Sequence, residues 1–392
     1  MSKWPGIRHQ FRLDQQQAHF AAMIFASHPL EVTEGITKDG ERLDVEGYPF
    51  FLANSGKRTR RTLEALAEYF GVAFGDAALT HGTALGLAQI LGGVRVSPEQ
   101  EILTSRNEHD AVGETLRFRA ERDGTRYRTV QLYRDSRTVS QDEIVQNVAS
   151  ALRPSTRLLV LTWVYSSDGV KLPLAEIGRL VDRENQRRLR PEDQLLFVVD
   201  GVHGFGVEDV MFADLNCDFF IAGCHKWIFG PRGTAIIAGR HAAWRHVVPM
   251  VATLSAAPNL PAFPHIPGGV IAFENRWALA TALDFHRKVL VKSDVQARVR
   301  ELTARFKEGL AGIGGIDLVT PDSTELSSGV VCFDLDRHSP DQAVEHLRAR
   351  GIVASVSAWD HHAGRNHVRF SVSILNSEHE VDTALAVLEQ AC

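Results

Sequence analysis

The stretch DFFIAGCHKWIFGPRG, residues 218–233, places a lysine directly after a run of apolar residues. Residues 219–222 are typical of a buried strand, and a turn containing glycine and proline closes the stretch. Lys226 lies between them, flanked by His225 and Trp227. Such a lysine commonly belongs to a surface loop and keeps its ammonium group in water. The alternative is an amine whose pKa is lowered by burial and by cationic neighbours, ready to form a Schiff base.

Apolar strands of the same kind recur along the first two thirds of the chain. Helical patterns at residues 141–152 and 174–188 lie between several of them. Near-continuous apolar strands that alternate with helices indicate an α/β fold, with a mainly parallel central sheet covered on both faces. Ligands of such sheets bind outside the carboxyl ends of the strands, which is where Lys226 is expected. The predicted strands are residues 101–105, 129–133, 156–164, 194–200, 218–223 and 234–239.

The pattern changes after residue 270. A long helical pattern leads into a strand–helix–strand–helix series over residues 327–390, which is typical of a small α+β domain. Residues 15–32 are apolar with a helical period, and we expect them to form a helix that packs on one domain or on a partner subunit. The predicted division is an N-terminal segment of residues 1–20, a large domain of residues 21–270 and a small C-terminal domain of residues 271–392.

The composition is that of an ordinary globular protein: of 392 residues, 44% are hydrophobic and 23% are charged. The formal net charge of -5 provides no basic surface, so no nucleic-acid partner is expected. Neither a run of about 18 apolar residues nor a secretory signal is visible, so we expect a cytoplasmic protein without a membrane span. The four cysteines show no zinc-binding spacing and are expected to be reduced.

A histidine-rich stretch, DHHAGRNH at residues 360–367, admits more than one interpretation. Its spacing matches no common zinc pattern, so we predict no metal site, and the simplest expectation for the stretch from His361 to His367 is an exposed loop. The alternative is that His361 or His362 lines the entrance for the substrate.

Three other strand ends carry groups with a chemical use. Asp200 ends an apolar strand and is either a buried hydrogen-bonding group or the partner of a protonated ring nitrogen. Thr83 opens a helix after Gly82, and free N–H groups at a helix N-terminus bind phosphate, although many such turns only cap a helix. His109 presents a flat ring that can stack on another ring. Together with Lys226 they form the set of groups that holds pyridoxal 5'-phosphate.

Two motifs, VVDGVHGFG at residues 198–206 and GCHKWIFGPRGTAII at residues 223–237, resemble the class V aminotransferase family. These are fold-type I pyridoxal phosphate enzymes that include cysteine desulfurases, and GCHKW is most similar to the isopenicillin N epimerase branch. FASHP at residues 25–29 and GGVIAFENRWALA at residues 268–280 resemble pyridoxal enzymes of siderophore and antibiotic pathways, including lincosamide pathways. The resemblance extends from about residue 20 to the end of the chain and implies pyridoxal 5'-phosphate as the cofactor.

The resemblance implies catalytic roles for three residues. Lys226 would bind the cofactor as a Schiff base and move the proton at Cα of the substrate. Asp200 would pair with the pyridine nitrogen and keep it protonated, and His109 would stack on the face of the ring. His203 falls where the family places a glutamine or histidine near the phenolic oxygen of the cofactor.

The resemblance also implies binding roles. Thr83, with the N–H groups of Thr83 and Ala84, would hold the phosphate, helped by His225. Arg369, in HVRFSVSILNS, matches the arginine that binds the substrate carboxylate. The guanidinium fork suits a carboxylate because it binds both oxygens, and the alternative for Arg369 is a surface pair between two strands.

The chain departs from the family pattern in the cofactor site. Ser166 takes the place of an asparagine that the family often has in that turn, and we expect Ser166 to bind the cofactor there. Gly223 replaces a serine or threonine whose hydroxyl would bind the phosphate. The site of the family is shared across a two-fold dimer, so the resemblance implies a homodimer. Gly268 and Gly269 would then approach the phosphate bound by the neighbouring subunit.

The absence of a cysteine from one loop reduces the number of reactions that the chain could catalyse. Cysteine desulfurases use a nucleophilic cysteine on a loop of the small domain, and the corresponding residues 355–368 contain none. Cys224 and Cys332 are expected to be buried filler. We therefore favour C–S cleavage by β-elimination on a cysteine S-conjugate in secondary metabolism. Decarboxylation-coupled oxidative deamination, transamination and epimerisation remain alternatives, as does a non-catalytic binding protein of the same fold.

Overall fold

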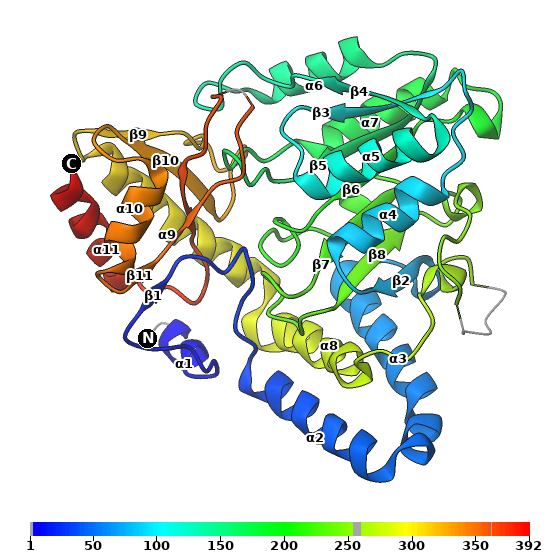
Figure 1. The fold of residues 1–392 in the computed structure, drawn as a ribbon, viewed down its shortest axis with the longest axis horizontal. Coiled ribbons are helices and arrows are strands. Elements are labelled where there is room, and N and C mark those ends of the chain that lie inside the picture. The colour runs from blue at the N-terminus through cyan, green and yellow to red at the C-terminus, as the bar shows by residue number, and fades with distance from the viewer. Residues whose placement is uncertain (1–2, 254–259, 362) are drawn as a thin grey trace.

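The structure is a computed structural model and describes residues 3–253, 260–361 and 363–392. A seven-stranded sheet forms the centre of the molecule (Figure 1). The strand order is β2-β8-β7-β6-β5-β3-β4. β8 runs antiparallel to both of its neighbours, and all other pairs are parallel, which confirms the predicted α/β fold. The strands are β2 (Ala77–Thr80), β3 (Glu101–Ser105), β4 (Arg126–Val130), β5 (Thr156–Thr162), β6 (Leu196–Asp200), β7 (Phe219–Gly223) and β8 (Ala235–Gly239).

The apolar runs of the sequence form the middle of this sheet. Every residue of β5, β6 and β7 is buried, as expected for parallel strands with both faces covered. The strand predicted at residues 129–133 is wrong in position, since β4 covers residues 126–130 instead. β4 pairs only with β3 and is largely exposed, so its apolar residues do not mark its bounds.

Helices cover both faces of the sheet; in Figure 1, α2 lies along the bottom of the molecule and α3 rises from its end toward β2. α3 and α8 lie against one another, and the α8 axis continues into a π-helical turn at His286–Leu290. No helix in the described part of the chain is both long enough and apolar enough to cross a membrane. The helices of this part are α1 (Trp4–Arg8), α2 (Leu30–Glu46), α3 (Tyr48–Phe70), α4 (Thr83–Gly93), α5 (Asp110–Asp123), α6 (Gln141–Ala151), α7 (Leu174–Asn185) and α8 (Phe273–Phe285).

A smaller antiparallel sheet, of order β12-β13-β10-β9, lies beside the large one with its helices on one face. Its apolar residues form a hydrophobic cluster of their own around Phe306, Phe333 and Phe370. This is the α+β module that the sequence predicts. Its elements are α9 (Lys292–Ala311), β9 (Ile316–Leu318), β10 (Val330–Leu335), α10 (Pro340–Arg348), β11 (Ile352–Val353), β12 (Ser355–Val356), β13 (Val368–Ser371) and α11 (Glu378–Ala391).

The helix predicted over residues 15–32 is wrong. The chain there forms a short strand, β1 (Ala18–His19), that pairs parallel with β11, and a helix begins only at Leu30. Ala18 and Phe20 belong to the core of the small sheet, whereas Ala26 donates its N–H to the carbonyl of His225, 2.9 Å away. The segment is apolar because its residues are buried in the cores of both sheets. Its apolar residues therefore do not indicate one face of a helix. The domain limits at residues 20 and 270 stay predictions.

Candidate active site

The parallel pairing of two adjacent central strands brings Asp200 and Lys226 to the same end of the sheet, the carboxyl end of these strands. β6 and β7 run parallel, with Asp200 opposite Ile221, and Lys226 follows shortly after the end of β7. Burial lowers the pKa of Lys226 to about 8; the Asp200 carboxylate opposes this shift and the Arg369 guanidinium adds to it. An amine with such a pKa is partly neutral near pH 7, as a nucleophile requires.

Asp200 presents one open carboxylate oxygen. Its Oδ1 accepts the N–H of Val202 at 3.1 Å, and the side chain is 2% exposed. Burial raises the pKa of Asp200 to about 6, and Lys226 opposes the rise. Within the described residues no hydrogen bond reaches Oδ2, so this oxygen is available to a protonated ring nitrogen.

His203 is held in one tautomer. The indole N–H of Trp227 donates to Nδ1 of His203 at 3.4 Å, so a neutral ring carries its proton on Nε2. Burial lowers the pKa of His203 well below its usual range, and Lys226 and Arg369 lower it further. The ring is therefore a neutral donor, which suits a phenolate oxygen.

The N-terminus of α4 forms a cradle with β7. Gly82 caps the helix without a side-chain hydrogen bond, which leaves the first N–H groups of α4 free, including that of Ala84. Thr83 Oγ1 accepts the N–H of Gly223 at 2.9 Å, and Nδ1 of His225 is buried without a hydrogen-bond partner. Free helix N–H groups and an unused imidazole nitrogen fit a phosphate group.

The missing hydroxyl at Gly223 has a steric reason. A Cβ at this position would lie 2.9 Å from Cε1 of His225 and 3.0 Å from Oγ1 of Thr83. A serine or threonine would therefore displace the imidazole of His225.

His109 both caps α5 and faces the site. Its Nδ1 accepts the N–H of Ala111 at 3.1 Å, which fixes the orientation of the ring. His109 is an exposed residue, yet partial desolvation lowers the pKa of its ring, and Lys226 lowers it further. A neutral ring in fixed orientation suits stacking on another flat ring.

Glu108 is a residue that the sequence reasoning missed. Its carboxyl group accepts the hydroxyls of Ser105 at 2.7 Å and Thr162 at 2.6 Å. Burial raises the pKa of Glu108 to about 7 against these hydrogen bonds, and Asp200 adds to the rise. Its place next to His109, at the end of a predicted strand, was the signal available in the sequence.

Arg369 lies in the site without a counter-charge. It is 8% exposed, and donates from Nε to Ser355 Oγ at 3.1 Å and from Nη1 to the carbonyl of Ser166 at 3.0 Å. None of the described carboxylates forms an ion pair with it. Ser166, predicted to bind the cofactor, here contacts Arg369 through its backbone. A buried guanidinium without an anion is a ready site for the carboxylate of a substrate.

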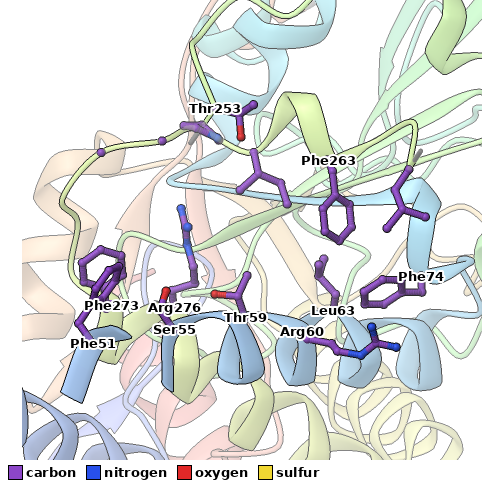
Figure 2. Close-up of a pocket in the computed structure, with 16 residues that line it drawn as sticks. Phe51, Ser55, Thr59, Arg60, Leu63, Phe74, Thr253, Phe263, Phe273 and Arg276 are labelled. Carbon is purple, nitrogen blue, oxygen red and sulfur yellow. The ribbon is translucent and has the colours of Figure 1, made fainter. Parts of the chain in front are cut away.

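Gly268 and Gly269 do not join this cluster within one chain. They line a cavity of about 470 Å³ between α3 and the start of α8, together with Arg276 (Figure 2). Gly269 has φ +113°, a backbone conformation that favours glycine. Their approach to the phosphate of a neighbouring subunit stays a prediction.

The sequence predicted that the histidine-rich stretch from His361 to His367 is an exposed loop. The structure shows that only part of this stretch is exposed. His367 is fully buried, with Nδ1 2.9 Å from Asp334 and Nε2 3.2 Å from Asp360. Burial alone would lower the pKa of His367, but these two carboxylates outweigh it and raise the pKa to about 9. His361 is exposed, and His362 lies outside the described residues. In the part that the structure covers, no group of three or more histidine, cysteine, aspartate or glutamate side chains is arranged so that it could hold a metal ion.

The cysteines near the site are inert filler, as predicted. Cys224 and Cys332 are fully buried, and burial raises the pKa of both thiols. A thiol that stays protonated is a poor nucleophile.

Comparisons with known proteins find relatives of this chain. The model of the Aminotransferase class-V family matches residues 51–384. Isopenicillin N epimerase of Streptomyces clavuligerus is 27% identical over 355 residues, which cover 86% of this chain and 85% of that protein. An L-cysteine desulfhydrase-like protein of Epichloe uncinata is 24% identical over 232 residues, 58% of this chain and 49% of that protein.

A solved structure shows the same fold. The cystine C–S lyase in complex with its reaction product cysteine persulfide superposes with a TM-score of 0.85 at 21% identity, over 98% of this chain and 99% of that one. At this identity the likeness shows the architecture alone.

Proposed function

The chain belongs to the class-V aminotransferase family, and on this premise we propose that it cleaves the C–S bond of a cysteine S-conjugate by β-elimination. That it is a pyridoxal phosphate enzyme of this fold follows from the family. The observation that carries the finer proposal is the unpaired Arg369, held by Ser166 and Ser355 close enough to lower the pKa of Lys226. An amino-acid carboxylate bound there places Cα near that amine.

The residues of the site fit the cofactor. The open oxygen of Asp200 suits the pyridine nitrogen, the Nε2–H of His203 suits the phenolic oxygen, and the α4 N-terminus with Thr83 and His225 suits the phosphate. When bound, pyridoxal phosphate draws electrons from Cα of the attached amino acid and so weakens the bonds to it.

Lys226 moves the proton in this proposal. Its amine takes the proton from Cα, and the electron pair left behind expels the sulfur from Cβ as a thiolate, so the Cα–H and Cβ–S bonds break. Hydrolysis of the released enamine gives pyruvate and ammonia. The lowered pKa of Lys226, about 8, suits a group that both takes and returns a proton near neutral pH.

The absence of a thiol in the small-domain loop favours a free thiolate product. Residues 355–368 contain no cysteine, so this loop offers no acceptor for the sulfur atom. An L-cysteine desulfhydrase-like protein is similar in sequence to this chain. This similarity supports C–S cleavage; a role in secondary metabolism is our inference from the resemblance of residues 25–29 and 268–280 to pathway enzymes.

The test is a product assay with a panel of S-substituted cysteines, including S-methyl-, S-benzyl- and S-glutathionyl-derived conjugates. We expect equal amounts of pyruvate, ammonia and thiol from at least one of them, and none with Lys226→Ala. Oxygen-dependent release of carbon dioxide and an aldehyde, without thiol, would replace β-elimination by oxidative deamination. No product with any conjugate would remove the proposal.

Epimerisation is the second candidate, because isopenicillin N epimerase of Streptomyces clavuligerus matches 86% of the chain. It requires return of the proton to the opposite face of Cα. Incubation in deuterium oxide separates the two: epimerisation incorporates deuterium at Cα of the recovered amino acid and inverts it, whereas β-elimination consumes the amino acid.

We also propose a cytoplasmic homodimer. Large apolar side chains are exposed near the cavity of Figure 2, among them Tyr48, Leu52 and Val270, which is 96% exposed. Such a patch favours a protein partner. Light scattering on the holo-protein should give twice the chain mass, and a monomer that retains the cofactor would contradict the dimer.

A further inference from the structure

Arg276 is a partly buried cation without a partner. Among the described residues its guanidinium forms no hydrogen bond and no ion pair, and Nη2 is buried without an acceptor. Burial alone lowers the pKa of Arg276, to about 10, with no contribution from any carboxylate. Burying an unpaired charge is costly, so folded proteins supply an anion for such a group.

Arg276 is also held in place. The hydroxyl of Thr62 on α3 donates to its backbone carbonyl at 3.2 Å, which anchors this turn of α8. In Figure 2 its side chain extends into the space between α3 and the segment that carries Thr253. The guanidinium is therefore presented to a cavity by a fixed backbone.

The two cavities that share Arg276 contain no acid. The one of about 470 Å³ has apolar walls such as Phe51 and Phe273, and its other arginine, Arg60, pairs with Glu64 at 2.8 Å. The second, of about 360 Å³, is lined by His81, Arg232 and apolar or neutral residues. Neither lining contributes an aspartate or glutamate, so the anion for Arg276 comes from outside the described protein atoms.

The second cavity borders the phosphate cradle. His81 precedes the Gly82–Thr83 turn that opens α4, and Arg276 lowers the pKa of His81 after burial does. On the other wall, Ala235 pairs with Gly223, whose N–H binds Thr83. Arg276 is thus placed beside the end of the site where a phosphate fits.

The cradle itself offers no fixed positive charge for a dianion. Burial, Lys226 and Arg232 all lower the pKa of His225, so its ring is neutral. The remaining donors are neutral N–H and hydroxyl groups, and Lys226 is used in the bond to the cofactor. Arg232 lines the same cavity but is exposed to water. A dianionic phosphate is bound more strongly by a guanidinium that is shielded from water than by an exposed one such as that of Arg232.

We infer that Arg276 is the cationic ligand of the cofactor phosphate. The phosphate has two possible sources: the cofactor of the same chain, reached past His81, or the cofactor of the second copy in a dimer, reached through the cavity that Arg276 shares with Gly268 and Gly269. The inference rests on the cofactor that the proposed function also uses, and it is independent of which bond of the substrate breaks.

The test measures cofactor binding and the state of the phosphate, not turnover. Arg276→Gln removes the charge, and we expect the dissociation constant of pyridoxal phosphate to rise about 10- to 100-fold, the effect of one charge-assisted hydrogen-bonding group. Arg276→Lys keeps a charge and should recover part of the loss. The matched control is Arg60→Gln, which removes a paired arginine from the same cavity and should leave binding unchanged.

Phosphorus NMR gives an independent readout. In the wild-type holo-protein the bound phosphate should stay dianionic between pH 5 and 8, since a neighbouring guanidinium disfavours protonation. In Arg276→Gln it should titrate within this range. Should Arg276→Gln fold poorly, Arg276→Met and Arg276→Lys provide the same comparison.

Hybrid dimers distinguish the two sources. One chain carries Arg276→Gln and the other Lys226→Ala, so covalent cofactor is held only by the first chain. Slow release from this hybrid shows that Arg276 of the second copy binds the phosphate, whereas release as fast as from the Arg276→Gln homodimer assigns it to the same chain.

Three results separate failure of this inference from failure of the proposed function. Unchanged binding and an unchanged phosphorus spectrum in Arg276→Gln overturn the inference. A weaker dimer with full cofactor affinity also overturns it, since the partner of Arg276 is then a protein carboxylate. If the wild-type protein itself binds no pyridoxal phosphate, the proposed function fails first.

Discussion

Replacing Arg369 by methionine should weaken substrate binding strongly while leaving the fold almost as stable. The guanidinium is 8% exposed, and its two hydrogen bonds go to neutral acceptors, the carbonyl of Ser166 and the hydroxyl of Ser355. Losing two hydrogen bonds from a charged donor costs about 3–6 kcal/mol. Removing a buried charge that lacks a counter-ion regains several kcal/mol. The two contributions nearly cancel, so the free energy of unfolding of the apo-protein should change by about 1 kcal/mol or less.

The effect on the substrate is one-sided. A bidentate pair between guanidinium and carboxylate is lost without compensation, about 3–5 kcal/mol, so kcat/KM should fall by roughly 150- to 5000-fold, chiefly through KM. Arg298→Met is the matched control, because that arginine is equally buried but pairs with Glu378 at 2.6 Å. It should lose stability and keep KM. Denaturant unfolding of the apo-proteins and steady-state kinetics on the best conjugate measure both quantities.

One result would refute this reasoning. If Arg369→Met unfolds several kcal/mol more easily and its remaining folded fraction keeps a normal KM, the arginine is a structural cross-strand group. The Arg369 guanidinium, which has no ion-pair partner among the described residues, would then not bind the substrate.

Four further predictions follow from the same geometry. Asp200→Asn should retain the cofactor but lose activity about 100- to 1000-fold, because an amide cannot keep the ring nitrogen protonated; absorbance and kinetics together check this. The rate at which apo-protein combines with added pyridoxal phosphate should rise with pH to a midpoint near 8, the pKa of Lys226, and a flat profile between pH 6 and 10 would contradict it. The pKa of His367 is raised in the fold to about 9, above its unfolded value, so its stabilisation is complete below about pH 6.5 and lost as pH rises through 9, and His367→Gln should remove that pH dependence of unfolding. Gly223→Ser should weaken cofactor binding about tenfold by displacing His225, and the double variant with His225→Ala should bind better than Gly223→Ser alone.

The sequence predicted the central strands of the sheet and the residues that lie at their carboxyl ends. Apolar runs that are buried on both faces define β5, β6 and β7, and parallel strands bring their ends together, so Asp200 and Lys226 had to meet. The exposed edge strand β4 and the segment before α2 were misplaced, because neither has an apolar pattern set by a single buried face.

The remaining site depends on contacts that spacing does not encode. Ser166 acts on Arg369 through a backbone carbonyl, which any residue could supply, so its side chain was a misleading guide. Arg276 and Glu108 are informative through their surroundings: one lacks a partner and the other has three hydroxyl groups around it. Such facts exist only in three dimensions.

Residues 18–26 connect the small sheet to the peptide beside Lys226. At one end β1 adds to the edge of β11 in the small domain, and at the other Ala26 holds the carbonyl of His225, the residue next to Lys226. Any rotation of the small domain therefore pulls on the peptide beside the lysine. Deleting residues 18–26 would detach that peptide from its anchor, so a shortened protein should retain them.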